Sequence, residues 1–143
     1  MYMIQGLEDF KTYNKAMELG ESVWSIVATW SYFEKDTIRK QLVRSCDSIA
    51  ANLSEGLGRY HFKESRNFSF YARGSLFETR TWLDKAMNRK LIDGEVYKTL
   101  ETALEVIGKM LNTYIKSIGT VNEPEEIYRN PKPPIPNPPI PNP

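Results

Sequence analysis

Residues 48–78 read SIAANLSEGLGRYHFKESRNFSFYARGSLFE, and this stretch decides the fold of the chain. It joins two segments of helical spacing through a short turn bounded by Gly56 and Gly58. We expect the first of these helices to stop at one of the two glycines, because glycine best tolerates the left-handed conformation that closes a helix. The stretch therefore predicts a helical hairpin, and its small residues indicate close packing.

Apolar residues at spacings of three and four continue on both sides of this hairpin and predict four helices in all. The first starts near Leu7, and its inward residues are Phe10, Tyr13, Met17, Trp24, Val27 and Trp30. The second opens near Asp36, with Ile38, Leu42, Ser45, Ile49 and Leu53 inside. The third covers residues 63–88, with Phe68, Ala72, Ser75, Trp82, Leu83 and Ala86 inside. The fourth begins with Asp93 as its cap and buries Val96, Leu100, Ala103, Ile107, Met110, Leu111, Tyr114 and Ile118.

Short connections between helices of about 20 to 25 residues favour antiparallel neighbours. The predicted fold is therefore all-α, an antiparallel up-down-up-down four-helix bundle over residues 1–120. All nine prolines lie from Pro124 onward, and PPIPN repeats from Pro133, so residues 121–143 are predicted to be an extended proline-rich tail. This tail is either a disordered end or a strand that docks in an aromatic groove of a partner or a neighbouring subunit.

Gly74 lies in the middle of the predicted third helix, where glycine costs about 1 kcal/mol relative to alanine. That cost is offset if a neighbouring backbone comes close. We expect Ala50 and Ala51 of the second helix to supply the contact, with Ser75 beside it.

The composition is that of one ordinary globular domain, with 143 residues, 41% apolar and 26% charged. No apolar run is long enough to span a membrane, and the first residues do not resemble a secretion signal, so a cytoplasmic protein with no membrane partner is expected. Cys46 is the only cysteine, which excludes an intrachain disulfide and predicts a small buried side chain.

Charge is distributed unevenly along the chain. Residues 35–90 hold twelve Lys or Arg against six Asp or Glu, a net charge of +6, whereas the whole chain carries +1. Arg66, Arg73 and Arg80 are seven residues apart and so share one stripe of the third helix. Such a stripe can follow a phosphate backbone. It is equally typical of a helix surface or subunit interface whose arginines pair with nearby Asp47, Glu55, Glu64 and Glu78.

Asn52, Glu55 and Arg59 stand three and four residues apart, so their side chains can meet at the end of the second helix. A catalytic interpretation would make Glu55 a general base. However, no nucleophile or metal-ligand cluster accompanies it, and His61 is the only histidine. We expect these residues to cap the helix and form hydrogen bonds, and we expect no catalytic site, metal or cofactor.

The aromatic residues indicate more than one buried surface. Trp24, Trp30 and Trp82 fit a core or a subunit interface. Phe70 and Phe77 are seven residues apart and lie off the predicted inner face of the third helix. Self-association is the preferred explanation for this second apolar face.

The hairpin resembles the signature of the 23S rRNA intervening sequence proteins and the related accessory proteins of diversity-generating retroelements. The matching positions are Ser48, Ile49, Asn52, Glu55, Gly56, Gly58, Arg59, Glu64, Phe68, Ala72, Arg73, Gly74, Ser75 and Glu78. This resemblance implies a four-helix bundle that assembles into a ring, often a pentamer. It further implies that a basic surface binds nucleic acid or, in the retroelement branch, a reverse transcriptase with its RNA.

The functional hypothesis is a non-catalytic homo-oligomer that associates with RNA or DNA. The predicted phosphate contacts are Arg39, Lys40, Arg44, Arg59, Lys63, Arg66 and Arg73. The alternative is a protein-interaction scaffold whose basic hairpin serves subunit contacts only.

Overall fold

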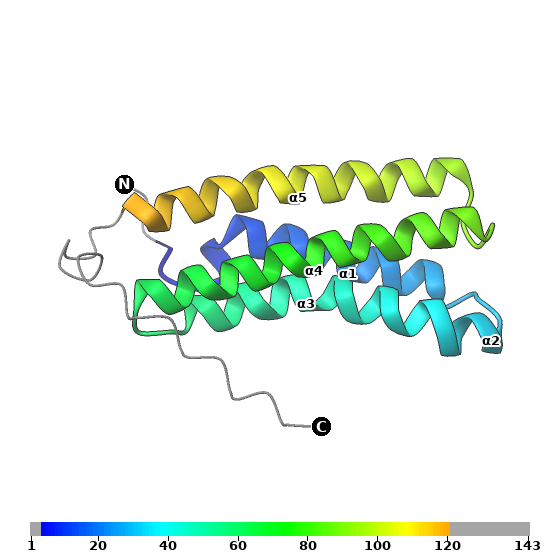
Figure 1. Ribbon diagram of the computed structural model, residues 1–143, viewed down its shortest axis with the longest axis horizontal. Helices are drawn as coiled ribbons and strands as arrows, with labels where there is room; N and C mark the ends of the chain where they lie inside the picture. The colour runs from blue at the N-terminus through cyan, green and yellow to red at the C-terminus, as the bar shows by residue number, and fades with distance from the viewer. Residues whose placement is uncertain (1–3, 121–143) are drawn as a thin grey trace, which may run out of the picture.

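The computed structural model describes residues 4–120, and every regular element within them is helical (Figure 1). Four long helices form the body: α1 (Lys11–Val27), α3 (Lys40–Leu57), α4 (Phe62–Asn88) and α5 (Gly94–Thr120). The short elements are a 3-10 turn η1 (Leu7–Asp9), a helical turn α2 (Tyr32–Glu34) and a π-helical turn η2 (Lys35–Arg39) that runs into α3. Successive long helices run in opposite directions, so the predicted all-α up-down-up-down bundle is confirmed. The predicted proline-rich tail lies outside the described residues.

The spacing predicted the buried residues of α3 correctly and those of α5 in part, because Val96, Ala103, Met110 and Tyr114 are only half-buried and the buried Leu104 was not predicted. Ile38, Leu42, Ser45, Ile49 and Leu53 are all buried, and so are Leu100, Ile107 and Leu111 of α5. The backbone N–H of Val96 donates to the carboxylate of Asp93 at 2.8 Å, which confirms the predicted cap of the last helix. None of the helices in residues 4–120 combines the length and apolar character needed to cross a membrane.

The predicted inner face of α1 is partly wrong. Phe10 and Val27 are buried as expected, but Met17 is 44% exposed and Trp24 is 50% exposed. The buried side of α1 holds smaller residues, namely Thr12, Ala16, Leu19, Gly20, Val23 and Val27. Both sets fit a helical period, and the smaller set faces the core because it lets α1 lie close to α3. The side chain of Asp47 on α3 occupies the space beside Gly20, at 2.7 Å from where a β-carbon would stand.

The turn between α3 and α4 falls where the sequence predicted it, but for a different reason. α3 ends at Leu57, and Gly58 follows with φ −75°, which any residue adopts. The left-handed conformation occurs instead at Lys90, with φ 59°, just after α4 ends. The requirement for glycine at position 56 comes from packing, because a β-carbon there would stand 2.8 Å from the β-carbon of Phe68.

The close contact predicted at Gly74 is absent. A β-carbon on Gly74 would meet no atom within 4 Å, and Ala51 is exposed, although α3 and α4 do form the most extensive helix pair among the described residues. The two helices approach at Gly56, near the turn. Gly74 points away from α3.

Candidate nucleic-acid interface

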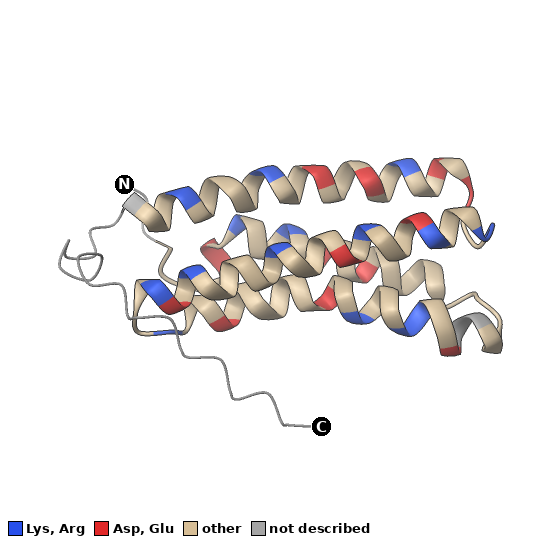
Figure 2. Cartoon of the chain, in the orientation of Figure 1, with Lys and Arg blue, Asp and Glu red and all other residues tan. Residues whose placement is uncertain are grey.

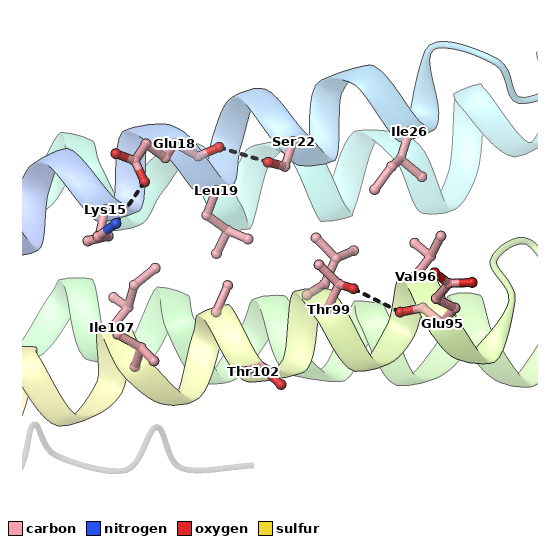
Figure 3. Close-up of a pocket in the computed structure, with 13 residues that line it drawn as sticks. Lys15, Glu18, Leu19, Ser22, Ile26, Glu95, Val96, Thr99, Thr102 and Ile107 are labelled. Carbon is pink, nitrogen blue, oxygen red and sulfur yellow. Dashed lines mark hydrogen bonds and ion pairs between the residues drawn. The ribbon is translucent and has the colours of Figure 1, made fainter.

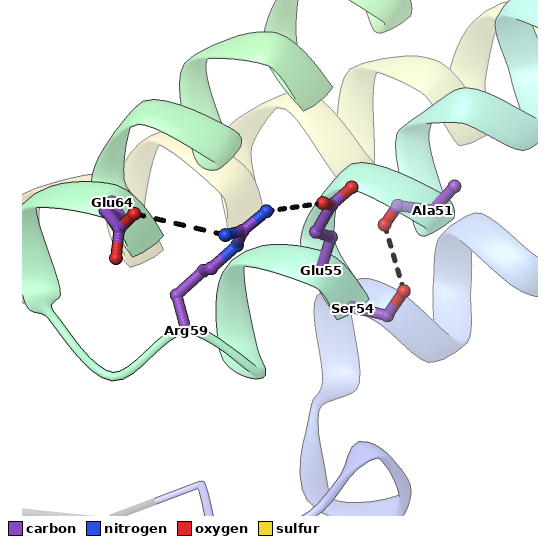
Figure 4. A network of polar contacts seen from close by, with 5 residues as sticks. All are labelled: Ala51, Ser54, Glu55, Arg59 and Glu64. Atoms are coloured by element: carbon purple, nitrogen blue, oxygen red, sulfur yellow. Dashed lines mark hydrogen bonds and ion pairs between the residues drawn. The ribbon is translucent and has the colours of Figure 1, made fainter.

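Arg59 is the centre of a polar cluster at the α3–α4 turn (Figure 4). Its guanidinium donates to the carboxylate of Glu55 at 2.7 Å and lies 4.0 Å from that of Glu64. The guanidinium carbon also stands 4.8 Å from the centre of the Phe68 ring. Arg59 is therefore shared between two carboxylates and an aromatic face, and it ties the end of α3 to the start of α4.

Asn52 and Glu78 also belong to the motif, and each forms a hydrogen bond within its own helix rather than with the Arg59 cluster. The side-chain amide of Asn52 donates to the carbonyl of Ser48 at 2.8 Å, so Asn52 does not join the Glu55–Arg59 pair. On α4, the indole N–H of Trp82 donates to Glu78 at 3.2 Å. The expected helix-end contact is thus confirmed for Glu55 and Arg59 and wrong for Asn52.

Two of the predicted phosphate contacts lie at the opposite end of α3 and already have partners there. The ammonium of Lys40 donates to the carboxylate of Asp36 at 2.6 Å, and this hydrogen bond raises the pKa of Lys40. The guanidinium carbon of Arg39 lies 5.0 Å from the centre of the Trp24 ring. Since α3 spans 18 residues, this end is about 27 Å from the Arg59 cluster.

Arg44, Lys63 and Arg73 differ from the other predicted contacts. All three are exposed, and none forms an ion pair with the carboxylates of residues 4–33 and 36–119, whose side chains the structure describes. Arg73 makes one contact, with its guanidinium carbon 5.7 Å from the centre of the Phe77 ring. These three cations are free to meet an external anion.

The arginine stripe of α4 does not lie on its outermost side. Arg80 is 4.0 Å from the half-buried carboxylate of Glu101 on α5. Arg66 also lies against α5, since a β-carbon on Gly119 would stand 3.2 Å from its Nη2 atom. Both ends of the stripe therefore lie near α5, and Arg73 between them is exposed without an ion pair in the described residues.

The predicted contacts consequently do not merge into one basic surface. In Figure 2, blue Lys and Arg segments and red Asp and Glu segments are interspersed along α4 and α5. The interpretation that arginines pair with nearby carboxylates is correct for Arg59, and Lys40 pairs with Asp36, which was not predicted. Nucleic-acid contact by the other basic residues stays a prediction.

We define the α4 outer face as six exposed residues that follow spacings of four and three along α4. They are Lys63, Asn67, Phe70, Gly74, Phe77 and Thr81. Phe70 is 45% exposed and Phe77 is 58% exposed, which confirms that both lie off the inner face. A β-carbon on Gly74, between these two residues, would meet no atom within 4 Å. The backbone of the α4 outer face is therefore open to a neighbour between the two rings.

Three further exposed aromatic residues escaped the sequence reasoning. Tyr71 is 58% exposed next to Phe70, and Tyr32 and Phe33 are 83% and 76% exposed in α2. Tyr71 shows no signal of its own in a helix that carries aromatic residues on several sides. Tyr32 and Phe33 are adjacent in the sequence and lie just before the predicted start of the second helix near Asp36. Two neighbouring aromatic residues at such a position are a signal from which their exposure could have been predicted.

Two residues that a catalytic interpretation could use, Cys46 and Glu55, are respectively buried and paired. No three His, Cys, Asp or Glu residues in residues 4–120 lie close enough together to hold a metal ion. Burial raises the pKa of the Cys46 thiol to about 12. Glu55, the residue of the catalytic interpretation, is bound to Arg59.

Comparison with known proteins agrees with this architecture. The structure is similar to the crystal structure of a protein with unknown function from the S23 ribosomal protein family of Bacteroides thetaiotaomicron, with a TM-score of 0.67 and 23% identity. The similarity covers 73% of this chain and 98% of that one, and at this identity it supports the fold alone. No curated protein matches the chain. A family model described as 23S rRNA-intervening sequence protein matches residues 8–113, and the chain therefore belongs to the 23S rRNA-intervening sequence protein family.

Proposed function

We propose that this chain is a non-catalytic accessory protein that associates with RNA as a homo-oligomer. The observation that carries the proposal is the position of Arg73 beside the α4 outer face, between two exposed phenylalanines and without a carboxylate partner in the described residues. Because the α4 outer face is proposed below to join the subunits, Arg73 at its edge stays available to phosphate and is repeated once in each subunit. The family description, which names a ribosomal RNA insertion, makes RNA the first nucleic acid to test.

Arg44 and Lys63 extend the proposed contact from Arg73 along the hairpin. Each is exposed and has no ion pair with the described side chains of residues 4–33 and 36–119, so binding a phosphate breaks none of the pairs found there. Arg59 and Lys40 are weaker candidates because an RNA contact would compete with Glu55 or Asp36. Three phosphate contacts give modest affinity for a single bundle, and an oligomer would increase it through avidity.

Self-association is proposed to use the α4 outer face. Spacings of four and three match the seam along which two helices pack, and Gly74 would let a second helix approach between Phe70 and Phe77. A ring of five copies and association with a reverse transcriptase are implied by the family resemblance and remain predictions.

RNA binding is tested by reversing the charge of the three unpaired cations together, as Arg44→Glu, Lys63→Glu and Arg73→Glu. The matched control reverses three exposed lysines on α5, as Lys98→Glu, Lys109→Glu and Lys116→Glu, which changes the net charge equally. The probe is a single RNA strand of about 20 nucleotides, longer than the usual binding site of such proteins. Fluorescence anisotropy over a salt series gives the slope of log affinity against log salt.

We expect the first variant to reduce that slope by about 2, since each lost phosphate contact removes about 0.7 for a single strand. The α5 variant should keep the slope of the unmodified protein. Equal losses in both variants would mean that net charge alone attracts the RNA. An unmodified protein that binds no RNA at low salt would refute the proposal.

Gly74 specifically favours a second candidate, a protein-interaction scaffold. A mid-helix glycine with open space suits a helix partner better than a nucleotide, so the same face would then serve subunit contacts alone. RNA binding by the unmodified protein separates the candidates, and light scattering tests the shared interface by comparing Phe70→Glu with Phe77→Glu against Tyr32→Glu plus Phe33→Glu. Loss of the oligomer in the first variant only, with no salt-dependent RNA binding by the unmodified protein, would favour the scaffold.

A further inference from the structure

A groove of about 490 Å³ lies between α1 and α5, on a different side of the bundle from the α4 outer face (Figure 3). Its apolar lining comes from both helices: Leu19, Ile26, Val96, Ala103, Val106 and Ile107. Val106 is 44% exposed, although valine is a residue that usually lies inside. The four-helix body therefore leaves one helix pair incompletely closed.

The polar groups along this groove are largely engaged with each other. The Ser22 hydroxyl donates to the carbonyl of Glu18 at 3.1 Å, and the Lys15 ammonium donates to the Glu18 carboxylate at 3.1 Å. On α5, the Thr99 hydroxyl donates to the carbonyl of Glu95 at 3.0 Å. An ordinary extended peptide laid here would bury backbone N–H groups that find few acceptors, which is unfavourable for each unsatisfied group.

One segment of this chain avoids that cost. Residues 133–143 read PPIPNPPIPNP, and seven of these 11 residues are proline, which has no backbone N–H. The segment carries no charged side chain, so it brings no ion into an apolar groove. Its preferred polyproline II conformation also reduces the conformational entropy lost on docking.

The length of chain beyond the described residues allows this segment to reach the groove. α5 ends at Thr120, and the nearest lining residue, Ile107, lies 13 positions earlier, about 20 Å along the helix. Residues 121–132 span about 37 Å when extended at about 3.1 Å per residue. Residues 133–143 can therefore turn back along α5 and lie in the groove.

The spacing of the two isoleucines matches the length of the groove. Ile135 and Ile140 are five residues apart, about 15 Å in polyproline II. Val96 and Ile107 mark the two ends of the apolar lining on α5, about 16 Å apart in a helix. We propose that residues 133–143 dock in the α1–α5 groove of their own chain, with Ile135 and Ile140 inserted near its two ends.

The test uses the full chain with a spin label on Asn142→Cys. Cys46 is buried, so the label goes to the new thiol. We expect the label to broaden the amide signals of Val96, Ala103 and Val106 in the NMR spectrum, and to leave those of Phe70 and Phe77 unaffected. Val106→Glu should abolish this broadening because it places a charge in the groove, whereas Asn112→Glu, also exposed on α5, should preserve it.

A second variant changes the docking segment instead of the groove, so its result does not depend on whether Val106→Glu disturbs the fold. Ile135→Ser with Ile140→Ser leaves residues 4–120 unchanged and should also remove the broadening. The proposal is overturned if the groove amides show no broadening in the labelled protein. It is also overturned if broadening occurs only between spin-labelled and isotope-labelled copies in a mixture, since the segment would then occupy another copy.

Discussion

Gly56 of α3 lies directly against Phe68 of α4. A β-carbon built on Gly56 would stand 2.8 Å from the β-carbon of Phe68 and 3.1 Å from the carbonyl oxygen of Ser65. Gly74, on the same hairpin, would gain a β-carbon with nothing within 4 Å. Gly56, near the end of α3, is therefore required by packing. Gly74, in the middle of α4, is not, although both belong to the same hairpin.

Alanine substitutions at these two positions should change stability in opposite directions. Gly56→Ala should lower the free energy of unfolding by about 1–3 kcal/mol. The new β-carbon would meet atoms on or next to the backbone of α4, which can move only if the whole helix shifts. Gly74→Ala should raise it by about 1 kcal/mol, the difference in helix propensity, because the site is open. Urea denaturation of both variants measures these changes. A neutral or stabilising Gly56→Ala would mean that α3 and α4 are further apart than described.

The sequence predicted the helices well because burial on one side of a helix produces a direct periodic signal. Leu42, Ile49 and Leu53 show that signal clearly in α3. In α1, however, two periodic sets overlap, and residue size misled the prediction toward Met17 and Trp24. Which glycine meets a neighbouring helix depends on where two helices cross, and spacing within one helix does not contain that information.

The same limit applies to the candidate interface. The pair Glu55–Arg59 was predictable because the two residues are only four positions apart, at the end of α3 and just beyond it. The pair Arg80–Glu101 joins two helices, so the sequence could not show that one end of the arginine stripe faces α5. The unpaired state of Arg73 likewise follows from the arrangement of the neighbouring helices.

Arg59 should matter more for stability than for RNA binding. Arg59→Ala removes a close ion pair and an aromatic contact, and we expect a loss of about 1 kcal/mol in the free energy of unfolding, since such surface interactions are worth less than 1 kcal/mol each. The control Lys40→Ala removes one exposed pair and should cost less. RNA affinity should fall more for Arg73→Ala than for Arg59→Ala. The reverse order in anisotropy titrations would contradict the assignment of Arg59 to the hairpin.

The Cys46 thiol should react only when the bundle opens. Its side chain is fully buried, and burial raises its pKa to about 12, so the reactive thiolate is scarce in the folded protein. At about pH 8, alkylation by iodoacetamide should be at least 100-fold slower in the native protein than in urea, in keeping with an opening cost of several kcal/mol. Mass spectrometry over time measures the reaction. A native rate close to that of the unfolded chain would show that α3 is not packed at Cys46.

Tyr97 joins α5 to α4 through a hydrogen bond that should make stability depend on alkaline pH. Its hydroxyl donates to the carboxylate of Asp84 at 2.6 Å, and this bond, followed by burial, raises the pKa of Tyr97. The folded state therefore holds the phenol proton more tightly than the unfolded state, so the stabilisation is complete below the unfolded value of about 10 and is lost as pH rises above it. Tyr97→Phe should cost about 1 kcal/mol at neutral pH and should flatten the decline in stability above about pH 10. Tyr60→Phe, at a residue that is 92% exposed, should change neither quantity. Urea denaturation across this pH range provides the measurement, and parallel declines for Tyr97→Phe and the unmodified protein would show that another group causes the alkaline loss.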